Sequence, residues 1–452
     1  MGDEMEKRNE FLCVALDLNN HPLRNEKTKF RVNYINALEY FNDKYSKKGM
    51  NAEHILDKYR KNLIVRSKKY IEDYNYKKGI KKVCSFRFKG FKLFTYRFLF
   101  VYDCLFINAF HDPELGKEIV DEFKTMFSSR YHAALEELYK VLYNGKSADR
   151  EFKLAENQMK VWFENKRFFD HPVNNIIVTA TMSAGKSTLI NAISGKKLAR
   201  TKNEACTDTA NFYFNKAFED NLIVKRNSNL EFKYETEYRD EDEYADICTY
   251  MNLTVKSQGR LCLIDTPGIN SSLNKDHAEA TQNAFNSINY EKIIYVINAT
   301  NIGAEDDIKY MKKIRQLMGN KSIIFVLNKI DTFRPGEDDI EDSINALKSD
   351  LTKIGFQDPV ICPTSAYAAG VFKKLLKSEK LSEEEELDCS MLLRKFSRDK
   401  YDLSKFYTVN SDIDYFTNDN VSFEDYDFNQ IKDCLYKTGI ANLEKLIIKG
   451  EV

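Results

Sequence analysis

The stretch that decides the fold is residues 176–193, Ile-Ile-Val-Thr-Ala-Thr-Met-Ser-Ala-Gly-Lys-Ser-Thr-Leu-Ile-Asn-Ala-Ile. The apolar, β-branched run at 176–178 predicts a buried strand, and the small residues at 180–185 predict a tight loop. A helix is expected to start near Lys186. Strand, small-residue loop, Gly-Lys-Ser and helix together are typical of a phosphate-binding loop, in which backbone N–H groups and the helix N-terminus hold phosphate oxygens.

The loop residues expected to contact a nucleotide are Ser183, Ala184, Gly185, Lys186, Ser187 and Thr188. In this pattern the lysine reaches the β- and γ-phosphates, and the Ser187 hydroxyl becomes a ligand of Mg²⁺. The usual motif opens with glycine, but Ala180 stands at that position. Alanine fits if its backbone keeps a negative φ. The alternative is a chance match in an ordinary strand–helix turn, so the downstream motifs must decide.

Composition limits the class of protein. The 452 residues predict two or three domains, and 69 basic residues balance 69 acidic ones. No global field therefore attracts nucleic acid or anionic lipid, and no DNA partner is expected. Nine cysteines without a Cys-x-x-Cys pair favour a reducing cytosol. The N-terminus lacks a signal-peptide pattern and the apolar stretch 86–110 is broken by charges, which predicts a cytoplasmic protein without a membrane span.

Residues 1–111 form the least readable region, predicted as mixed or helical. Between Lys77 and Tyr102, eight basic residues alternate with aromatic residues and no acid is present. One interpretation is a basic–aromatic surface for anionic headgroups or nucleic acid. The other, which we favour, is a core hairpin or helix whose cationic side chains reach outwards.

Residues 112–172 are predicted to form a helical segment that leads into the next domain. Asp112 is expected to cap a helix that has Pro113 at its first position. Two more helices follow, the last over 149–169, and His171-Pro172 ends the block. A core domain over residues 173–370 is predicted to come next.

Downstream of the loop, Thr207 lies about twenty residues beyond Ser187. A mobile threonine there can bind Mg²⁺ and the γ-phosphate, with Thr209 as the rival for this role. Residues 211–229 and 253–265 are expected to pair as an antiparallel edge of the sheet. The second segment ends in Asp-Thr-Pro-Gly, where Asp265 can hold Mg²⁺ through water and the Gly268 N–H can meet the γ-phosphate.

A further buried strand, 323–327, ends in Asn328-Lys329-Ile330-Asp331, which selects the base. The Asp331 carboxylate can accept from both N1–H and the exocyclic amine of guanine, whereas adenine offers neither donor there. An unpaired buried acceptor costs about 1–3 kcal/mol, which is enough for strong discrimination. Lys329 would lie along the base plane.

A short strand at 360–362 leads to Thr364-Ser365-Ala366, where Ser365 and the Ala366 N–H complete the base site and the N–H can meet guanine O6. Five motifs in this order, each at a strand end, predict a guanine-nucleotide site. The expected fold is α/β, a Ras-like P-loop GTPase domain with a mostly parallel sheet between helices, together with a helical N-terminal domain.

Two segments resemble the dynamin superfamily, especially bacterial dynamin-like proteins. Residues 183–193 carry the Ser-Ala pair before Gly-Lys that small Ras-type loops lack, and Thr-Gly-Ile-Ala-Asn-Leu at 438–443 is similar to the entry into the closing helix, here 437–452. The resemblance implies hydrolysis of GTP to GDP and phosphate with Mg²⁺ and a monovalent cation. It also implies a homodimer through the GTPase domain, and a membrane surface or a partner dynamin-like chain as further partners.

By the same resemblance, Ser183, Lys186 and Thr207 are the catalytic residues, with Ser183 stabilising transition-state charge. The metal-binding residues are Ser187, Thr207 and Asp265. Ile269 follows Gly268, so no Ras-like glutamine is present to orient water. The family instead relies on dimerisation and main-chain groups.

The resemblance stops short of the whole family pattern, because no long helical stalk, lipid-binding domain or hydrophobic paddle is visible after the core. Residues 371–436 are expected to form a helical, acidic insertion, in which Ser382 caps a helix that begins with four glutamates. Membrane action therefore rests on the resemblance alone. Two alternatives remain open: an RNA- or ribosome-associated GTPase, and a slow GTP-regulated protein-interaction switch.

Overall fold

The computed structural model describes residues 13–45, 53–63, 76–84, 86–89, 92–145, 152–200, 210–226, 230–235, 238, 246–255, 259–266, 285–406 and 427–449. The chain divides into two compact units. Unit 1 comprises Met1–Asp170, Ala217–Leu222 and Leu230–Phe232, and unit 2 comprises His171–Lys216, Ile223–Asn229 and Lys233–Val452. No described helix combines the length and apolar character that a membrane span requires.

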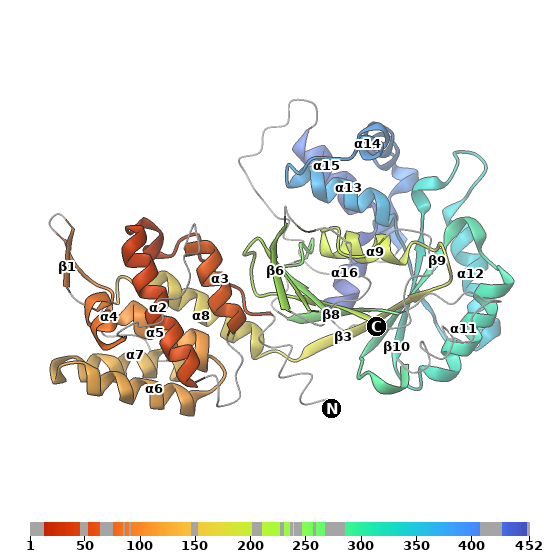
Figure 1. Ribbon diagram of the computed structural model, residues 1–452. Coiled ribbons are helices and arrows are strands. Elements are labelled where there is room, and N and C mark those ends of the chain that lie inside the picture. The colour runs from red at the N-terminus through yellow and green to blue at the C-terminus, as the bar shows by residue number, and fades with distance from the viewer. Residues whose placement is uncertain are drawn as a thin grey trace. The chain divides into compact units, whose positions relative to one another are not determined.

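Unit 1 is built from helices and one short hairpin (Figure 1). Its elements are α2 (Thr28–Tyr45), α3 (Glu53–Leu63), α4 (Tyr76–Val83), β1 (Phe86–Lys89), β2 (Lys92–Thr95), α5 (Arg97–Ala109), α6 (Pro113–Met126), α7 (His132–Asn144) and α8 (Glu156–Phe169). Asp112 caps α6 by accepting from the Leu115 N–H at 2.9 Å, with Pro113 in the first turn, as the sequence predicts. Helix α5 is mostly apolar and 12 of its 13 residues are buried, so it forms the centre of the unit.

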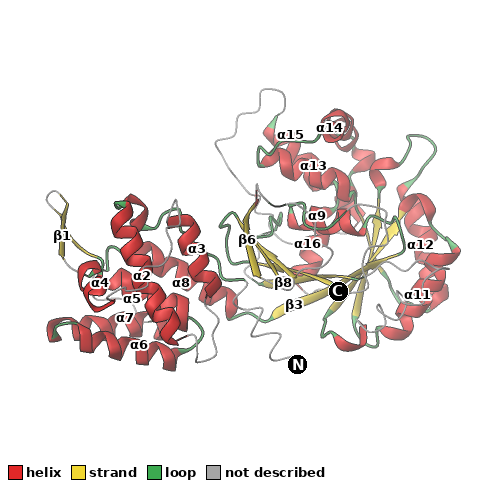
Figure 2. Ribbon diagram, viewed as in Figure 1, coloured by secondary structure: helices red, strands yellow, loops and turns green. Residues whose placement is uncertain are grey.

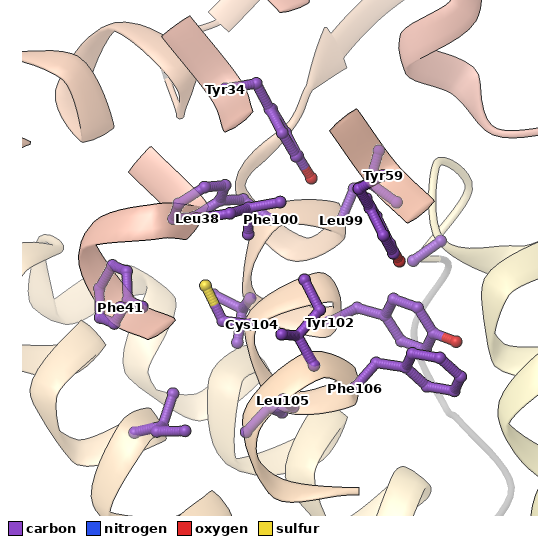
Figure 3. Close-up of a cluster of buried hydrophobic side chains, with 14 of the residues drawn as sticks. Tyr34, Leu38, Phe41, Tyr59, Leu99, Phe100, Tyr102, Cys104, Leu105 and Phe106 are labelled. Carbon is purple, nitrogen blue, oxygen red and sulfur yellow. The ribbon is translucent and has the colours of Figure 1, made fainter. Parts of the chain in front are cut away.

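Aromatic side chains fill the space around α5 (Figure 3). Phe41 stacks on Phe123 with ring centroids 4.8 Å apart, and Phe100 meets Phe123 edge-on at 5.9 Å. The carboxylate of Asp103 lies fully buried in this core and accepts from the Tyr34 hydroxyl at 2.5 Å and the Tyr59 hydroxyl at 2.9 Å. These hydrogen bonds satisfy a buried charge that would otherwise be strongly unfavourable.

The basic–aromatic stretch is divided between a surface helix and a core helix. Helix α4 buries Ile80 and Val83 and exposes four lysines, namely Lys77, Lys78, Lys81 and Lys82. Arg97, at the start of α5, is buried, donates to the Cys84 carbonyl at 2.9 Å and stacks 3.6 Å from the Tyr131 ring. The favoured interpretation, an apolar side in the core with cationic side chains reaching outwards, fits α4, whereas α5 is a core helix whose Arg97 is itself buried. The side chains of residues 85–95 lie outside those that the structure describes.

Unit 2 is organised around a sheet that has nine strands among the described residues (Figure 2), of which only Leu222 and Leu230–Phe232 belong to unit 1. The strands are β3 (Val173–Ala180), β4 (Asn211–Asn215), β5 (Leu222–Arg226), β6 (Leu230–Tyr234), β7 (Asp246–Thr249), β8 (Arg260–Asp265), β9 (Lys292–Asn298), β10 (Ser322–Asn328) and β11 (Val360–Pro363), in the order β11-β10-β9-β3-β8-β4-β7-β5-β6. The five strands from β11 to β8 are mutually parallel, while β4 joins β8 antiparallel. The predicted α/β fold with a helical N-terminal domain is confirmed.

One expectation about the sheet needs correction. Strand β4 does pair antiparallel with β8, but this pair is not an edge, because β7, β5 and β6 continue the sheet beyond β4. The second strand also begins at Arg260 rather than at residue 253. Every residue of β8 is buried, which suits a strand with a partner on each side.

The helices of unit 2 lie around this sheet. They are α9 (Lys186–Ser194), α11 (Glu305–Leu317), α12 (Ile340–Ile354), α13 (Ala366–Leu376), α14 (Glu383–Phe396), α15 (Phe428–Lys437) and α16 (Ile440–Lys449). Helix α9 packs against α13 and α16, and α11 packs against α12. Ser382 caps α14, as predicted, and the structure adds a reciprocal capping box with Glu385. Because β3, β8, β9, β10 and β11 are parallel, the loops after them meet at one edge of the sheet.

Candidate nucleotide-binding site

The phosphate loop connects β3 to α9 at this edge. Ala180 is the buried last residue of β3 and keeps a negative φ, so alanine is compatible with the position usually taken by glycine. The left-handed conformations fall later, at Ser183 (φ 59°) and Gly185 (φ 92°), and the helix begins at Lys186 as expected. A Cβ atom on Gly185 would lie 2.4 Å from the Asn328 side-chain nitrogen, so only glycine fits there.

Lys186 and Asp265 meet at the phosphate end of the site. The Lys186 ammonium forms an ion pair with the Asp265 carboxylate, and both side chains are largely buried. Asp265 is the last residue of β8, in register with Val178 of β3, which brings the two motifs together from positions 79 residues apart. Ser187 and Thr188 lie half-buried on the first turn of α9.

The donor set at this end fits magnesium. Among the described residues, no group of three or more His, Cys, Asp or Glu gathers to hold a metal. Mg²⁺ does not need such a cage, because it binds through one or two protein oxygens together with phosphate oxygens and water. The Ser187 hydroxyl and the Asp265 carboxylate are oxygen ligands of this kind, beside the lysine that would contact the phosphates.

Asn328, at the end of β10, joins the phosphate end to the base end. Its side-chain amide donates to the Ala184 carbonyl at 3.1 Å, and its oxygen accepts from the Ala366 N–H at 3.1 Å. One buried amide therefore fixes the phosphate loop relative to the turn before α13. The Ala366 N–H is engaged in this bond, and its contact with guanine O6 stays a prediction.

The 3₁₀ turn Ile330–Thr332, which carries Asp331, is held by Ser365. The Ser365 hydroxyl donates to the Asp331 carboxylate at 2.6 Å, and its backbone N–H donates to the Thr438 carbonyl at 3.0 Å. Lys329 adopts a left-handed conformation with φ 69°, and its side chain lies near Gly185. Asp331, Lys329 and Ser365 are thus brought together at the end of the site opposite Asp265.

Two buried or half-buried groups near the site were not predicted. Asp307, at the start of α11, accepts from the Thr181 hydroxyl of the phosphate loop at 2.7 Å and from the Tyr295 hydroxyl at 3.1 Å. Burial raises the pKa of Asp307, and these two hydrogen bonds partly offset the rise. Lys395 in α14 donates to the Asp331 and Phe333 carbonyls. In sequence, Asp307 is one of three acids in a first helical turn, a pattern that indicates only helix-dipole stabilisation.

Three predicted residues, Thr207, its rival Thr209 and Gly268, lie outside the described residues. Their roles at the metal and the γ-phosphate stay predictions. The described residues supply a lysine, a helix N-terminus and loop amides at one end, and a carboxylate held in place at the other. This arrangement can bind a charged phosphate chain and a base that presents two adjacent donors.

Comparison with known proteins agrees with this chemistry. Residues 176–330 match a family model described as the Dynamin family. No curated protein matches the chain significantly.

Similar solved structures include Era from Aquifex aeolicus (18% identity, 50% of this chain and 66% of that chain, TM-score 0.29) and Toc33 from Arabidopsis thaliana (13%, 45% and 79%, TM-score 0.30). Another is described as an oligomerised bacterial dynamin pair that senses and tethers membranes (14%, 88% and 73%, TM-score 0.35).

Proposed function

We propose that two copies of this chain activate GTP turnover by pairing through their nucleotide faces. The premise is that the chain carries a dynamin-superfamily GTPase domain and is a GTP-hydrolysing enzyme. The observation that carries the nucleotide assignment is the site assembled by Asn328. It holds the phosphate loop at Ala184 and the base-reading end at Ala366 with one side chain.

We assign hydrolysis to in-line attack of water on the γ-phosphorus. Lys186 and the loop amides stabilise the charge on the phosphate oxygens, and Ser183, in its left-handed conformation, contributes to the same cradle. Ser187, Asp265 and Thr207 would hold Mg²⁺, which supplies further charge neutralisation when bound. Asp331, fixed by Ser365, reads guanine.

Two observations support activation by a second copy. Ile269 follows Gly268, so the sequence offers no glutamine there to orient the attacking water. Met182, within the phosphate loop, is 44% exposed, which places an apolar side chain at the nucleotide face. A second copy covering this face would exclude water and help to place main-chain groups and a monovalent cation around the γ-phosphate.

We further propose peripheral action at anionic membranes from the cytosol. The exposed lysines of α4 (Lys77, Lys78, Lys81 and Lys82) supply a local positive surface on a chain of zero net charge. The eight cysteines that the structure describes are all buried and none of them forms a disulfide, which supports a reducing compartment. RNA could bind the same lysines. A slow GTP-regulated switch would require neither this lysine surface nor pairing through the nucleotide face.

The test is GTP turnover per molecule over a wide range of protein concentration, with and without anionic vesicles or RNA. Specific activity that rises with concentration supports the dimer, and additional stimulation by vesicles supports membranes. Stimulation by RNA alone would favour the RNA-associated alternative. Flat, very slow turnover with tight GTP binding would favour the switch.

The matched variant is Lys186→Ala, which removes the phosphate contact and is expected to abolish nucleotide binding or turnover. Lys353→Ala is the control, because Lys353 is an exposed lysine of α12 that pairs with Asp350 of the same helix. Full activity in Lys186→Ala would disprove the nucleotide assignment.

A further inference from the structure

We propose that Lys395 of α14 is a positioning residue for guanine recognition, which holds the turn that carries Asp331 in the orientation that reads the base. This inference rests on the proposed guanine site and assigns to the segment after β11 a part in base selection.

Lys395 holds the turn through two hydrogen bonds to backbone carbonyls. Its ammonium donates to the Asp331 carbonyl at 2.5 Å and to the Phe333 carbonyl at 2.6 Å. The first carbonyl lies within the short 3₁₀ turn Ile330–Thr332 and the second directly follows it, so both bonds together fix the backbone of the turn. The same ammonium lies 4.6 Å from the centre of the buried Tyr401 ring, a favourable cation–π contact.

Helix α14 is a fixed support for this lysine. Glu385 pairs with Lys374 of α13 at 2.6 Å, and Asp388 accepts from the Tyr367 hydroxyl at 2.8 Å. Near its C-terminal end, α14 is held by Phe396, whose ring meets Phe372 of α13 edge-on at 6.2 Å. These contacts are spread along α14, so the helix is expected to stay in place if the 3₁₀ turn Ile330–Thr332 moves.

Asp331 is consequently held in two independent ways. Ser365 fixes one carboxylate oxygen, and Lys395 fixes the backbone that carries the side chain. A carboxylate reads guanine only when its two oxygens face N1–H and the exocyclic amine at the same time. Without Lys395, rotation of the turn about the Ser365 contact would weaken the second of these bonds first.

The test is equilibrium binding of GDP and of IDP, which lacks the exocyclic amine, to the full chain. For Lys395→Met, which keeps the length and apolar contacts of the stem, the preference for GDP over IDP is expected to fall by about tenfold, the effect of losing one well-placed polar contact. Lys395→Arg, which keeps the charge and donors, should retain most of the preference. Arg394→Met, at the exposed position next to Lys395 in the same helix, should leave it unchanged.

An unchanged ratio of GDP to IDP affinity in Lys395→Met, or an equal loss for both nucleotides, would overturn the proposal, because a merely structural lysine predicts such results. If Lys395→Met does not fold, Lys395→Gln tests the same ratio with a neutral side chain that can still donate. Failure of the proposed function would look different, since the unmodified chain would then not prefer GDP over ADP.

Discussion

At the scale of single residues, the phosphate loop depends on backbone conformations that few side chains permit. Gly185 combines a left-handed conformation with an approach to Asn328 that leaves no room for a Cβ atom. Asn328 in turn donates to the Ala184 carbonyl. The same side-chain amide therefore holds the loop and occupies the space that a Cβ atom at Gly185 would need. A side chain at Gly185 would therefore displace the amide that joins both ends of the site.

Gly185→Ala is expected to weaken GDP binding by at least about tenfold, because it adds a steric clash to the conformational penalty of about 1–2 kcal/mol. Gly355→Ala is the matched control: Gly355 has a similar φ of 106°, but no atom lies within 4 Å of the added carbon. Calorimetric titration with GDP measures the difference. Equal affinities in the two variants would show that the approach to Asn328 is unimportant.

Asp307 is a residue whose negative charge is unfavourable at its buried position. Burial raises its pKa above the ordinary value of 3.8, so the folded state holds a proton more tightly than the unfolded state. Stability must therefore fall as pH rises from about 4 through the raised pKa, and the full penalty is present above it. The Thr181 and Tyr295 hydroxyls need only an acceptor oxygen, which an amide also provides.

Asp307→Asn is accordingly expected to be more stable than the natural chain at pH 8, with the advantage shrinking towards pH 4. Asp307→Ala removes the acceptor from both hydroxyls and should lose about 1–3 kcal/mol. Urea unfolding followed by circular dichroism across this pH range measures both effects. The single tryptophan, Trp162, lies in unit 1, so its fluorescence does not report on this site. A pH-independent difference between Asp307→Asn and the natural chain would contradict the argument.

At the scale of elements, the phosphate-loop helix is secured at its far end by a buried lysine. Lys373 of α13 donates to the Ala192 and Ile193 carbonyls at the end of α9, at 2.7 and 3.1 Å. It also pairs with Glu444 of α16 at 2.7 Å, and Glu444 accepts from the Thr254 N–H and hydroxyl, both at 2.5 Å. Burial lowers the pKa of Lys373, and Glu444 raises it. Three helices are thus joined through one ion pair.

Lys373→Met is expected to destabilise unit 2 by about 3–5 kcal/mol, because Glu444 is left as a buried charge without its cation. The double variant Lys373→Met/Glu444→Gln should recover part of this loss, since the amide is neutral and can still accept from Thr254. Urea unfolding of the single and double variants gives the coupling energy. Additive losses would mean that the two side chains do not act as a pair.

At the scale of the whole molecule, sequence predicts what local patterns specify. Lys186, Asp265 and Asn328 each follow a recognisable apolar strand, and the parallel sheet brings such strand ends to one edge. Contacts without a local signal were missed: Lys395 reaches its turn across 64 residues, and Asp307 reaches Thr181 across 126. The position of β8 inside the sheet was also missed, because an apolar run does not specify how many partners a strand has.

The long-range contacts of α16 have a consequence for the time course of synthesis. Asn174, at the start of β3, donates to the Ile447 carbonyl, which lies 273 residues later in the chain. At about 5–20 residues per second, a ribosome needs roughly 15–55 s to make that partner. Helices α2 to α8 precede β3 in the sequence and leave the ribosome first. Strand β3, in contrast, cannot contact α16 until that helix has been synthesised. The GTPase unit therefore reaches its final structure late, and this interval is when a nascent chain has most need of protection from aggregation.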